Sequence, residues 1–153
     1  MESDPRDDLA IIERAEAAPY VSYPATPRWM YPAFALWVGA YTAAYALLEV
    51  HALLFLAVVV GLLGAIILAL RWMHRWHGAL PLPGRGTPPA EITRVYRQYF
   101  AGIAVLVVAV VVLGLTAGIA VASVAGVLLS YPGLLAFDRA YHRAAAAVRE
   151  RLA

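Results

Sequence analysis

The chain has 153 residues, of which 63% are hydrophobic and only 14% are charged. So few polar residues cannot cover a water-soluble globule, and the composition predicts a membrane protein with one compact domain. Cysteine is absent, which excludes disulfides, thiolate metal sites and thiol nucleophiles. The formal charge of +2 comes from arginines that flank apolar runs, so the expected partners of this charge are membrane lipids and not nucleic acid.

The first 28 residues precede any long apolar run. Ser3, Asp4 and Pro5 form a helix-start signal, and the apolar residues that follow predict a short, weakly amphipathic helix that Pro19 ends. Acidic residues outnumber arginines here, and the basic start and cleavage pattern of a secretory signal is missing. We therefore expect this segment to stay attached to the protein.

Three apolar runs dominate the rest of the chain. Two of them, residues 29–48 and 50–70, have about the 20 residues that a helix needs to cross a hydrocarbon core roughly 30 Å thick. The third, residues 98–137, is about twice that length, so it is expected to fold back between Gly114 and Gly118. The prediction is four spans, at residues 29–48, 52–72, 98–115 and 118–137.

All twelve basic residues are arginines, and they precede the first span, separate the second span from the third, and follow the fourth. The positive-inside bias therefore predicts a multi-pass protein of the bacterial inner (plasma) membrane, with both termini and the middle loop in the cytoplasm. Aromatic residues typical of a membrane interface fall at the same predicted boundary, namely Trp29, Trp72, Trp76, Tyr96, Tyr99 and Tyr141.

The predicted fold class is an all-α integral membrane four-helix bundle of two tandem transmembrane hairpins. The expected segments are a cytoplasmic N-terminal part, a first hairpin, a Pro/Gly linker, a second hairpin and a cytoplasmic tail, at residues 1–28, 29–77, 78–94, 95–143 and 144–153. At an offset of 68, the ending Arg71-x-x-His74-Arg75 matches Arg139-x-x-His142-Arg143. Duplication of a two-helix unit explains this match, and so does the alternative that hairpins under the same charge rule look alike.

Small residues recur every four positions on three of the spans. No hydrophobic force drives helices together in lipid, so close backbone approach across small residues is what holds them. We expect these faces to be helix contacts, preferably inside the bundle. The valine-rich third span is expected to face lipid, and Pro132-Gly133 to kink or end the fourth. The small-residue faces are Ala35, Gly39 and Ala43; Ala57, Gly61, Ala65 and Ala69; and Gly118, Ala122, Gly126 and Ser130.

One face of the first span combines aromatic rings with a carboxylate. Trp37, Tyr41, Tyr45 and Glu49 recur every four residues. A carboxylate beneath aromatic faces can hold a lipophilic cation through charge and ring quadrupole, which makes this face the candidate ligand-binding site of a small transporter or channel. The favoured alternative is structural, because Glu49 lies at the outer edge and tyrosines in bundles commonly hydrogen-bond a neighbouring helix.

Arginines and tryptophans at the inner ends of the spans are the candidate lipid contacts. One interpretation is a specific headgroup clamp, because a guanidinium recognises phosphate through a planar fork of donors. The favoured alternative is ordinary anchoring, with apolar stems along the lipid and charged heads in water. The residues are Arg71, Arg75, Trp72 and Trp76 on the second span and Arg139 and Arg143 on the fourth.

Enzymatic chemistry has little support in this sequence. The serines and threonines of the spans have no nearby histidine and aspartate partners, and no two carboxylates share a membrane face, so no catalytic residue is predicted. His74 and His77 can share a helix face, but no third ligand is adjacent. Neither a metal nor another cofactor is therefore expected.

The acidic opening, residues 4–15, and the segment Thr26-Pro-Arg-Trp-Met-Tyr-Pro32 resemble a loose group of small four-helix actinobacterial integral membrane proteins. This resemblance implies a topology and no activity. The chain departs from small multidrug exporters of similar size, whose essential carboxylate lies in the middle of the first span. The prediction is a non-enzymatic structural or accessory membrane protein that packs against itself, as a homo-oligomer, or against another membrane protein.

Overall fold

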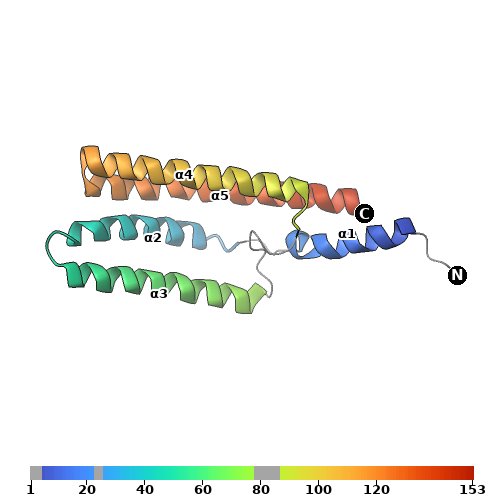
Figure 1. Cartoon of the computed structure of the whole chain (residues 1–153), viewed down its shortest axis with the longest axis horizontal. Coiled ribbons are helices and arrows are strands. Elements are labelled where there is room, and N and C mark those ends of the chain that lie inside the picture. The colour runs from blue at the N-terminus through green and yellow to red at the C-terminus, as the bar shows by residue number, and fades with distance from the viewer. Residues whose placement is uncertain (1–4, 23–25, 78–86) are drawn as a thin grey trace.

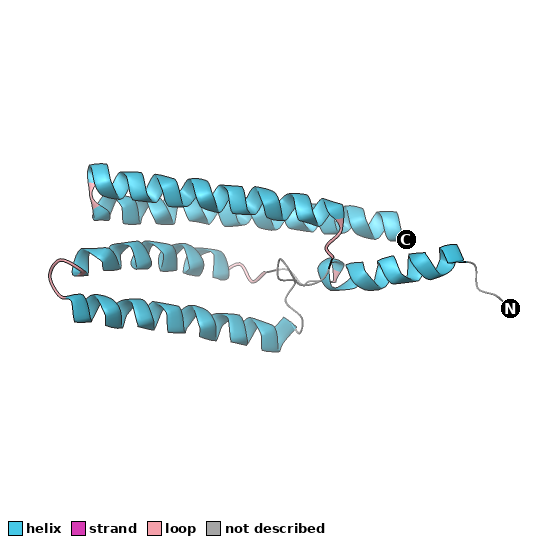
Figure 2. Ribbon diagram, in the orientation of Figure 1, coloured by secondary structure: helices cyan, strands magenta, loops and turns pink. Residues whose placement is uncertain are grey.

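The computed structural model describes residues 5–22, 26–77 and 87–153, and this part of the chain is built of helices with no strand (Figure 1, Figure 2). The predicted all-α class is therefore confirmed. The elements in chain order are α1 (Pro5–Val21), α2 (Met30–Ala44), the short 3₁₀ helix η1 (Tyr45–Leu47), α3 (Ala52–His77), α4 (Ala90–Ala117) and α5 (Ile119–Leu152).

Helix α5 is the centre of the arrangement. It packs along α4 and along α2, and its C-terminal end packs against α1. Helix α3 packs mainly on α2 and η1, so it lies at the edge of the molecule (Figure 1). The helices thus form two antiparallel hairpins, α2–α3 and α4–α5, of which only the second is closely packed.

The turn between α4 and α5 lies where the sequence predicted the chain to fold back. A single residue, Gly118, separates the two helices, and its φ of +92° lies in the left-handed region that side chains disfavour. Its carbonyl accepts the backbone N–H of Ala122 at 3.1 Å, which starts the next helix at once. One glycine is therefore enough to reverse the chain.

Small residues bring α2 and α5 into close contact. A Cβ added at Gly39 would overlap the side chain of Val127 and lie 3.2 Å from the carbonyl oxygen of Ser123. A Cβ added at Gly126 would lie 3.4 Å from Val38 of α2 and 3.7 Å from Val110 of α4, so three helices meet there. The predicted contact faces on the first and fourth spans are confirmed at these positions.

Ala43 does not form the predicted helix contact. The small-residue face of α3 is not covered within the described part of the chain, so the preference for packing inside the bundle is wrong for that face. Ala43 is exposed and its neighbour Ala44 is buried instead, because a strict four-residue spacing drifts by about 40° a step on an α-helix. On α3, Ala57, Gly61 and Ala65 are all exposed, because this helix turns a different, bulkier face toward α2.

The helices run further than the sequence predicted. Helix α1 continues past Pro19 to Val21, since a proline in the last turn removes only one backbone hydrogen bond. Helix α4 begins at Ala90, inside the expected linker 78–94. Pro132 lies within α5 and does not end it, so the expected tail, residues 144–153, is helical up to Leu152.

The buried core lies at one end of the molecule, where α1, the start of α4 and the end of α5 meet. We call this region the terminal cap. Ile92 and Val148 are fully buried there, whereas the central parts of α3 and α4 bury almost nothing. Apolar burial is driven by water, so the largest buried side chains are expected in the cap if lipid surrounds the rest. The buried residues where α2 meets α5 are mostly small, such as Ala35 and Ala122. The core residues of the cap are Ala17, Tyr20, Ile92, Val95, Tyr96, Tyr141, Ala145 and Val148.

Three helices, α3, α4 and α5, are long and apolar enough to cross a membrane. Their exposed surfaces are apolar too: the side chains of Leu53 on α3 and Leu115 on α4 are both 83% exposed. A protein that shows so much apolar helix surface is embedded in a membrane. Helix α2, with 15 residues, is shorter than a full span by itself.

Candidate functional site

The aromatic residues of α2 form a continuous row that fills the space between α2 and α3. Trp37 stacks on Tyr41 at 5.5 Å between ring centroids, and Tyr41 meets Tyr45 edge-on at 5.9 Å. The row is longer than the sequence suggested, because Phe34 lies 5.6 Å from Trp37 and Phe55 of α3 lies 5.3 Å from Tyr45. The spacing of Phe34 from Trp37 was a visible signal, whereas the contact with Phe55 required the turn geometry.

The row is fastened to α3 by a polar contact. The indole N–H of Trp37 donates to the backbone carbonyl of Leu62 at 2.9 Å. A buried indole donor needs such a partner, and in lipid there is no water to supply one. This hydrogen bond and the ring contacts together are the main attachment of α3 to the rest of the molecule.

Glu49 lies outside the row. It occupies the exposed turn between η1 and α3, and the structure brings Trp37, Tyr41 and Tyr45 together without enclosing the carboxylate among them. Trp37 stacks on Tyr41, Tyr41 meets Tyr45 edge-on, and the Trp37 donor binds the carbonyl of Leu62. This arrangement is that of a helix contact. Cation binding by these four residues stays a prediction.

Aromatic residues lie at one level at the ends of α2, α3, α4 and α5 that are away from the two hairpin turns. Trp29, which precedes α2, meets Trp72 of α3 at 5.8 Å between ring centroids. Tyr99 of α4 meets Phe137 of α5 at 4.4 Å. Contacts of α2 with α5 fix the relative height of the two pairs, because Gly39 lies beside Val127. The side chain of Trp76 lies outside the described residues.

Arginines lie within two helical turns of these aromatic residues in the sequence, just before α2 and on α3, α4 and α5. We call them the boundary arginines. All are exposed, and none of them forms an ion pair with an acidic side chain among the residues that the structure describes. Asp138 lies at this level, 3.5 Å from His142, and Glu91, one turn from Arg94, binds Arg151 instead. The boundary arginines are Arg28, Arg71, Arg75, Arg94, Arg97, Arg139 and Arg143.

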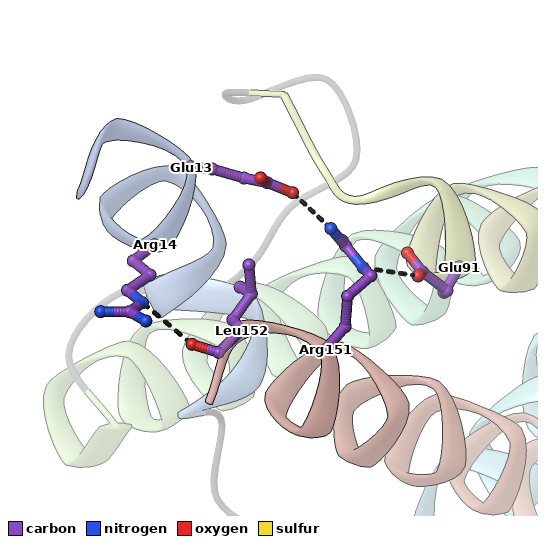
Figure 3. A network of polar contacts seen from close by, with 5 residues as sticks. All are labelled: Glu13, Arg14, Glu91, Arg151 and Leu152. Atoms are coloured by element: carbon purple, nitrogen blue, oxygen red, sulfur yellow. Dashed lines mark hydrogen bonds and ion pairs between the residues drawn. The ribbon is translucent and has the colours of Figure 1, made fainter. Parts of the chain in front are cut away.

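The terminal cap contains a polar network that the sequence did not predict (Figure 3). The guanidinium of Arg151 near the end of α5 donates to Glu13 of α1 and, at 3.2 Å, to Glu91 of α4. The guanidinium of Arg14 donates to the carbonyl of Leu152 at 2.9 Å and so caps the C-terminus of α5. These partners are far apart in the chain, and no local pattern pairs them.

Two further contacts explain how the cap is closed. The Tyr141 hydroxyl donates to the carbonyl of Tyr20 at 2.9 Å, so the end of α1 is fixed to α5 inside the core. Arg151 is charged throughout the physiological pH range, as arginine is in proteins. The hydrogen bond with Glu13 raises the pKa of its guanidinium further. Arg151 thus joins α1, α4 and α5 as a permanent cation.

An open pocket of about 440 Å³ lies beside this network. Three carboxylates, of Glu13, Glu16 and Glu91, and the guanidinium of Arg151 line it together with Pro88 and Pro89. Two of those carboxylates already bind Arg151. Within the described ranges, no three His, Asp or Glu side chains are arranged to hold a metal ion.

The hydroxyl groups of the apolar helices donate hydrogen bonds to backbone carbonyls of their own helix. Thr42, Thr116 and Ser123 donate to the carbonyl four residues earlier, at 3.0, 2.8 and 2.7 Å. Ser130 donates to the carbonyl of Val127 at 3.3 Å. Hydroxyls used in this way satisfy the polar group in an apolar environment and are not set up as nucleophiles.

Comparisons of the chain with known protein families, with curated proteins and with solved structures gave no match.

Proposed function

We propose that this protein is a non-enzymatic structural or accessory component of a bacterial plasma membrane. Its four long helices cross the bilayer as two hairpins, and the terminal cap and both chain ends lie in the cytoplasm. Its role is to pack through α3 against a transmembrane helix of a second copy or of another membrane protein.

Helix lengths measured from the aromatic level support four spans. From that level to the outer turn, α4 has 19 residues (99–117) and α5 has 19 residues (119–137). The 15 residues of α2 and the 3 of η1 add up to about 28 Å at the rise of each helix type, close to the hydrocarbon thickness of roughly 30 Å. On α3, 21 residues (52–72) lie between the turn and the aromatic level. The four helices therefore match one apolar layer.

The accessory role rests on one observation, the uncovered small-residue face of α3. Phe55 contacts Tyr45, and the carbonyl of Leu62 accepts the Trp37 donor. At about 100° per residue, Ala57 and Gly64 lie roughly opposite Phe55, and Gly61 lies about 120° from it. A Cβ added at Gly61 or at Gly64 would meet nothing within 4 Å, so no contact in the described part of the chain requires glycine there. Glycine weakens a helix interior by about 1 kcal/mol relative to alanine. Close approach of a partner helix would explain why glycine occupies these positions.

Cysteine cross-linking in native membranes tests the proposal, because the chain has no cysteine of its own. Ala57→Cys places a thiol on the uncovered face. The matched control is Val107→Cys on α4, a position 54% exposed whose neighbours at four-residue spacing, Ile103 and Val111, are large. The expected result is a cross-linked product with Ala57→Cys, to a second copy or to another protein, and little with Val107→Cys. Equal yields at the two positions would refute the proposed contact.

A further inference from the structure

Whether an arginine of this protein has an acidic partner depends on its position along the long axis of the molecule. In the terminal cap, Arg14 and Arg151 are engaged with the chain itself, through a carbonyl and two carboxylates. At the aromatic level, the boundary arginines have no acidic partner in the described part of the chain. Arg151 shows that this chain can pair an arginine by tertiary contacts, and it does so only away from the boundary.

The boundary arginines also repel one another. Arg71 and Arg75 are four residues apart on α3, and Arg139 and Arg143 are four residues apart on α5, so each pair shares a helix face. Like charges at this spacing destabilise a helix. Within the described part of the chain, the one hydrogen bond given by these four guanidiniums runs from Arg143 to the carbonyl of Arg139 at 3.2 Å. Seven arginines against Asp138 leave the level positive, because Glu91, one turn from Arg94, already binds Arg151.

We infer that the boundary arginines form a belt that binds anionic phospholipid headgroups in preference to zwitterionic ones. The inference rests on the proposed membrane placement and names the lipid class that this placement selects. A phosphodiester whose charge is not cancelled by choline complements the belt, and a guanidinium fork matches its oxygen atoms. Trp29 and Trp72, which are 57% and 39% exposed, lie beside the belt at the depth of the headgroup region.

These tryptophans make the inference measurable. The full chain is placed in phosphatidylcholine vesicles in which a minor fraction of the lipid carries bromine on its acyl chains, because bromine quenches tryptophan at contact. The brominated lipid is either phosphatidylglycerol or phosphatidylcholine at the same mole fraction. We expect quenching to show at least about a threefold preference for phosphatidylglycerol, which declines as salt rises from about 0.05 to 0.5 M.

The variant that tests the belt replaces Arg71, Arg75, Arg139 and Arg143 by Gln together. Its preference is expected to fall close to one. Arg149→Gln is the matched control, because Arg149 is an exposed arginine of α5 that lies beyond the boundary, and it is expected to keep the full preference. Arg75→Gln alone changes only the peripheral helix α3 and is expected to give an intermediate value. This single variant keeps the test informative if the fourfold variant does not fold.

The outcomes separate the two proposals. Equal quenching of the wild-type protein by both lipids would overturn the lipid preference and leave the membrane placement standing. A fourfold variant that folds and keeps the wild-type preference, or an Arg149→Gln variant that loses it, would also overturn the belt. No quenching by either lipid would contradict the proposed placement of the helices in the bilayer.

Discussion

The two hairpins of this protein differ in what lies between their helices. Helices α4 and α5 meet through glycine, alanine and valine and are joined by the single residue Gly118. Helices α2 and α3 are kept apart by a row of aromatic rings and are joined by the 3₁₀ helix and an exposed turn. Both hairpins are built of apolar residues. The helices lie close together where the side chains between them are small, and further apart where those side chains are large.

The two hairpins also differ in how they are attached to the rest of the molecule. The tight hairpin continues past the aromatic level into the terminal cap, where water drives burial of its core. The wide hairpin contributes α2 to the contact with α5, while α3 remains at the edge. At the offset of 68, Trp37, Tyr41 and Tyr45 correspond to Val105, Ala109 and Leu113, so the two hairpins cannot pack alike even if they arose by duplication.

The largest effect is expected in the cap. Ile92→Ala removes a fully buried side chain at the junction of three helices and is expected to lower the free energy of unfolding by about 2–5 kcal/mol. Ile67→Ala makes the same change on α3, where the side chain is 51% exposed and lipid replaces it, and is expected to change little. Unfolding of the purified protein in mixed micelles measures both. Similar losses of unfolding free energy for the two variants would contradict the claim that the cap is tightly packed and α3 is not.

The next effect concerns the close contact of α2 with α5. Gly39→Leu forces a side chain into Val127 and is expected to cost about 1–3 kcal/mol of stability. Gly61→Leu on α3 is the control, since a Cβ there would meet no neighbouring element in the described part of the chain, and it is expected not to lower the stability of the isolated protein. The same micelle titration compares them. A tolerant Gly39 would mean that the helices are not held at the spacing described here.

A smaller effect is expected in the aromatic row. Trp37→Phe keeps a ring but removes the donor to Leu62, and it is expected to weaken the attachment of α3 by about 0.5–1.5 kcal/mol. The distance between spin labels on α2 and α3 should broaden in this variant. The distance between labels on α4 and α5 should not change. Broadening in both hairpins, or in neither, would count against α3 as a separately attached helix.

The smallest effect is expected at the polar network of the cap. Arg151→Gln removes exposed ion pairs to Glu13 and Glu91, which contribute little in water and less at high salt. Amide hydrogen exchange should become modestly faster in α1, while the membrane part of α4 should exchange at the unchanged rate. Arg149→Gln is the control, because Arg149 forms no ion pair in the described part of the chain. A large loss of helix in α1 would mean that the core contacts of Tyr20 and Ala17 hold it less firmly than their burial indicates.

Much of the membrane layout could be predicted from local patterns. The turn at Gly118 followed from an apolar run too long for one span, and the aromatic level followed from tryptophans and tyrosines next to arginines. The contact faces around Gly39 and Gly126 followed from the spacing of small residues. Each of these signals lies within one or two turns of helix, where a single sequence is informative.

The contacts that join distant segments could not be predicted. Arg151 and Glu13 are 138 residues apart, and the local sequence around each residue does not indicate that the two pair. The start of α4 was expected to be part of a linker and the end of α5 a tail. Both segments contain many polar residues, so the sequence did not reveal that Ile92 and Val148 are buried. The small residues of α3 look like those of α5, and only the arrangement in space shows that one face is covered and the other is not.

The central claim is a four-pass topology with the cap and both ends in the cytoplasm. Single cysteines test it directly, with a membrane-impermeant thiol reagent applied to intact and to permeabilised cells. Val50→Cys, at a position 71% exposed in the turn of the wide hairpin, should be labelled in intact cells, whereas Ser22→Cys and Ala153→Cys should be labelled only after permeabilisation. Labelling of Ala153→Cys in intact cells, or of Val50→Cys only in permeabilised ones, would contradict this account.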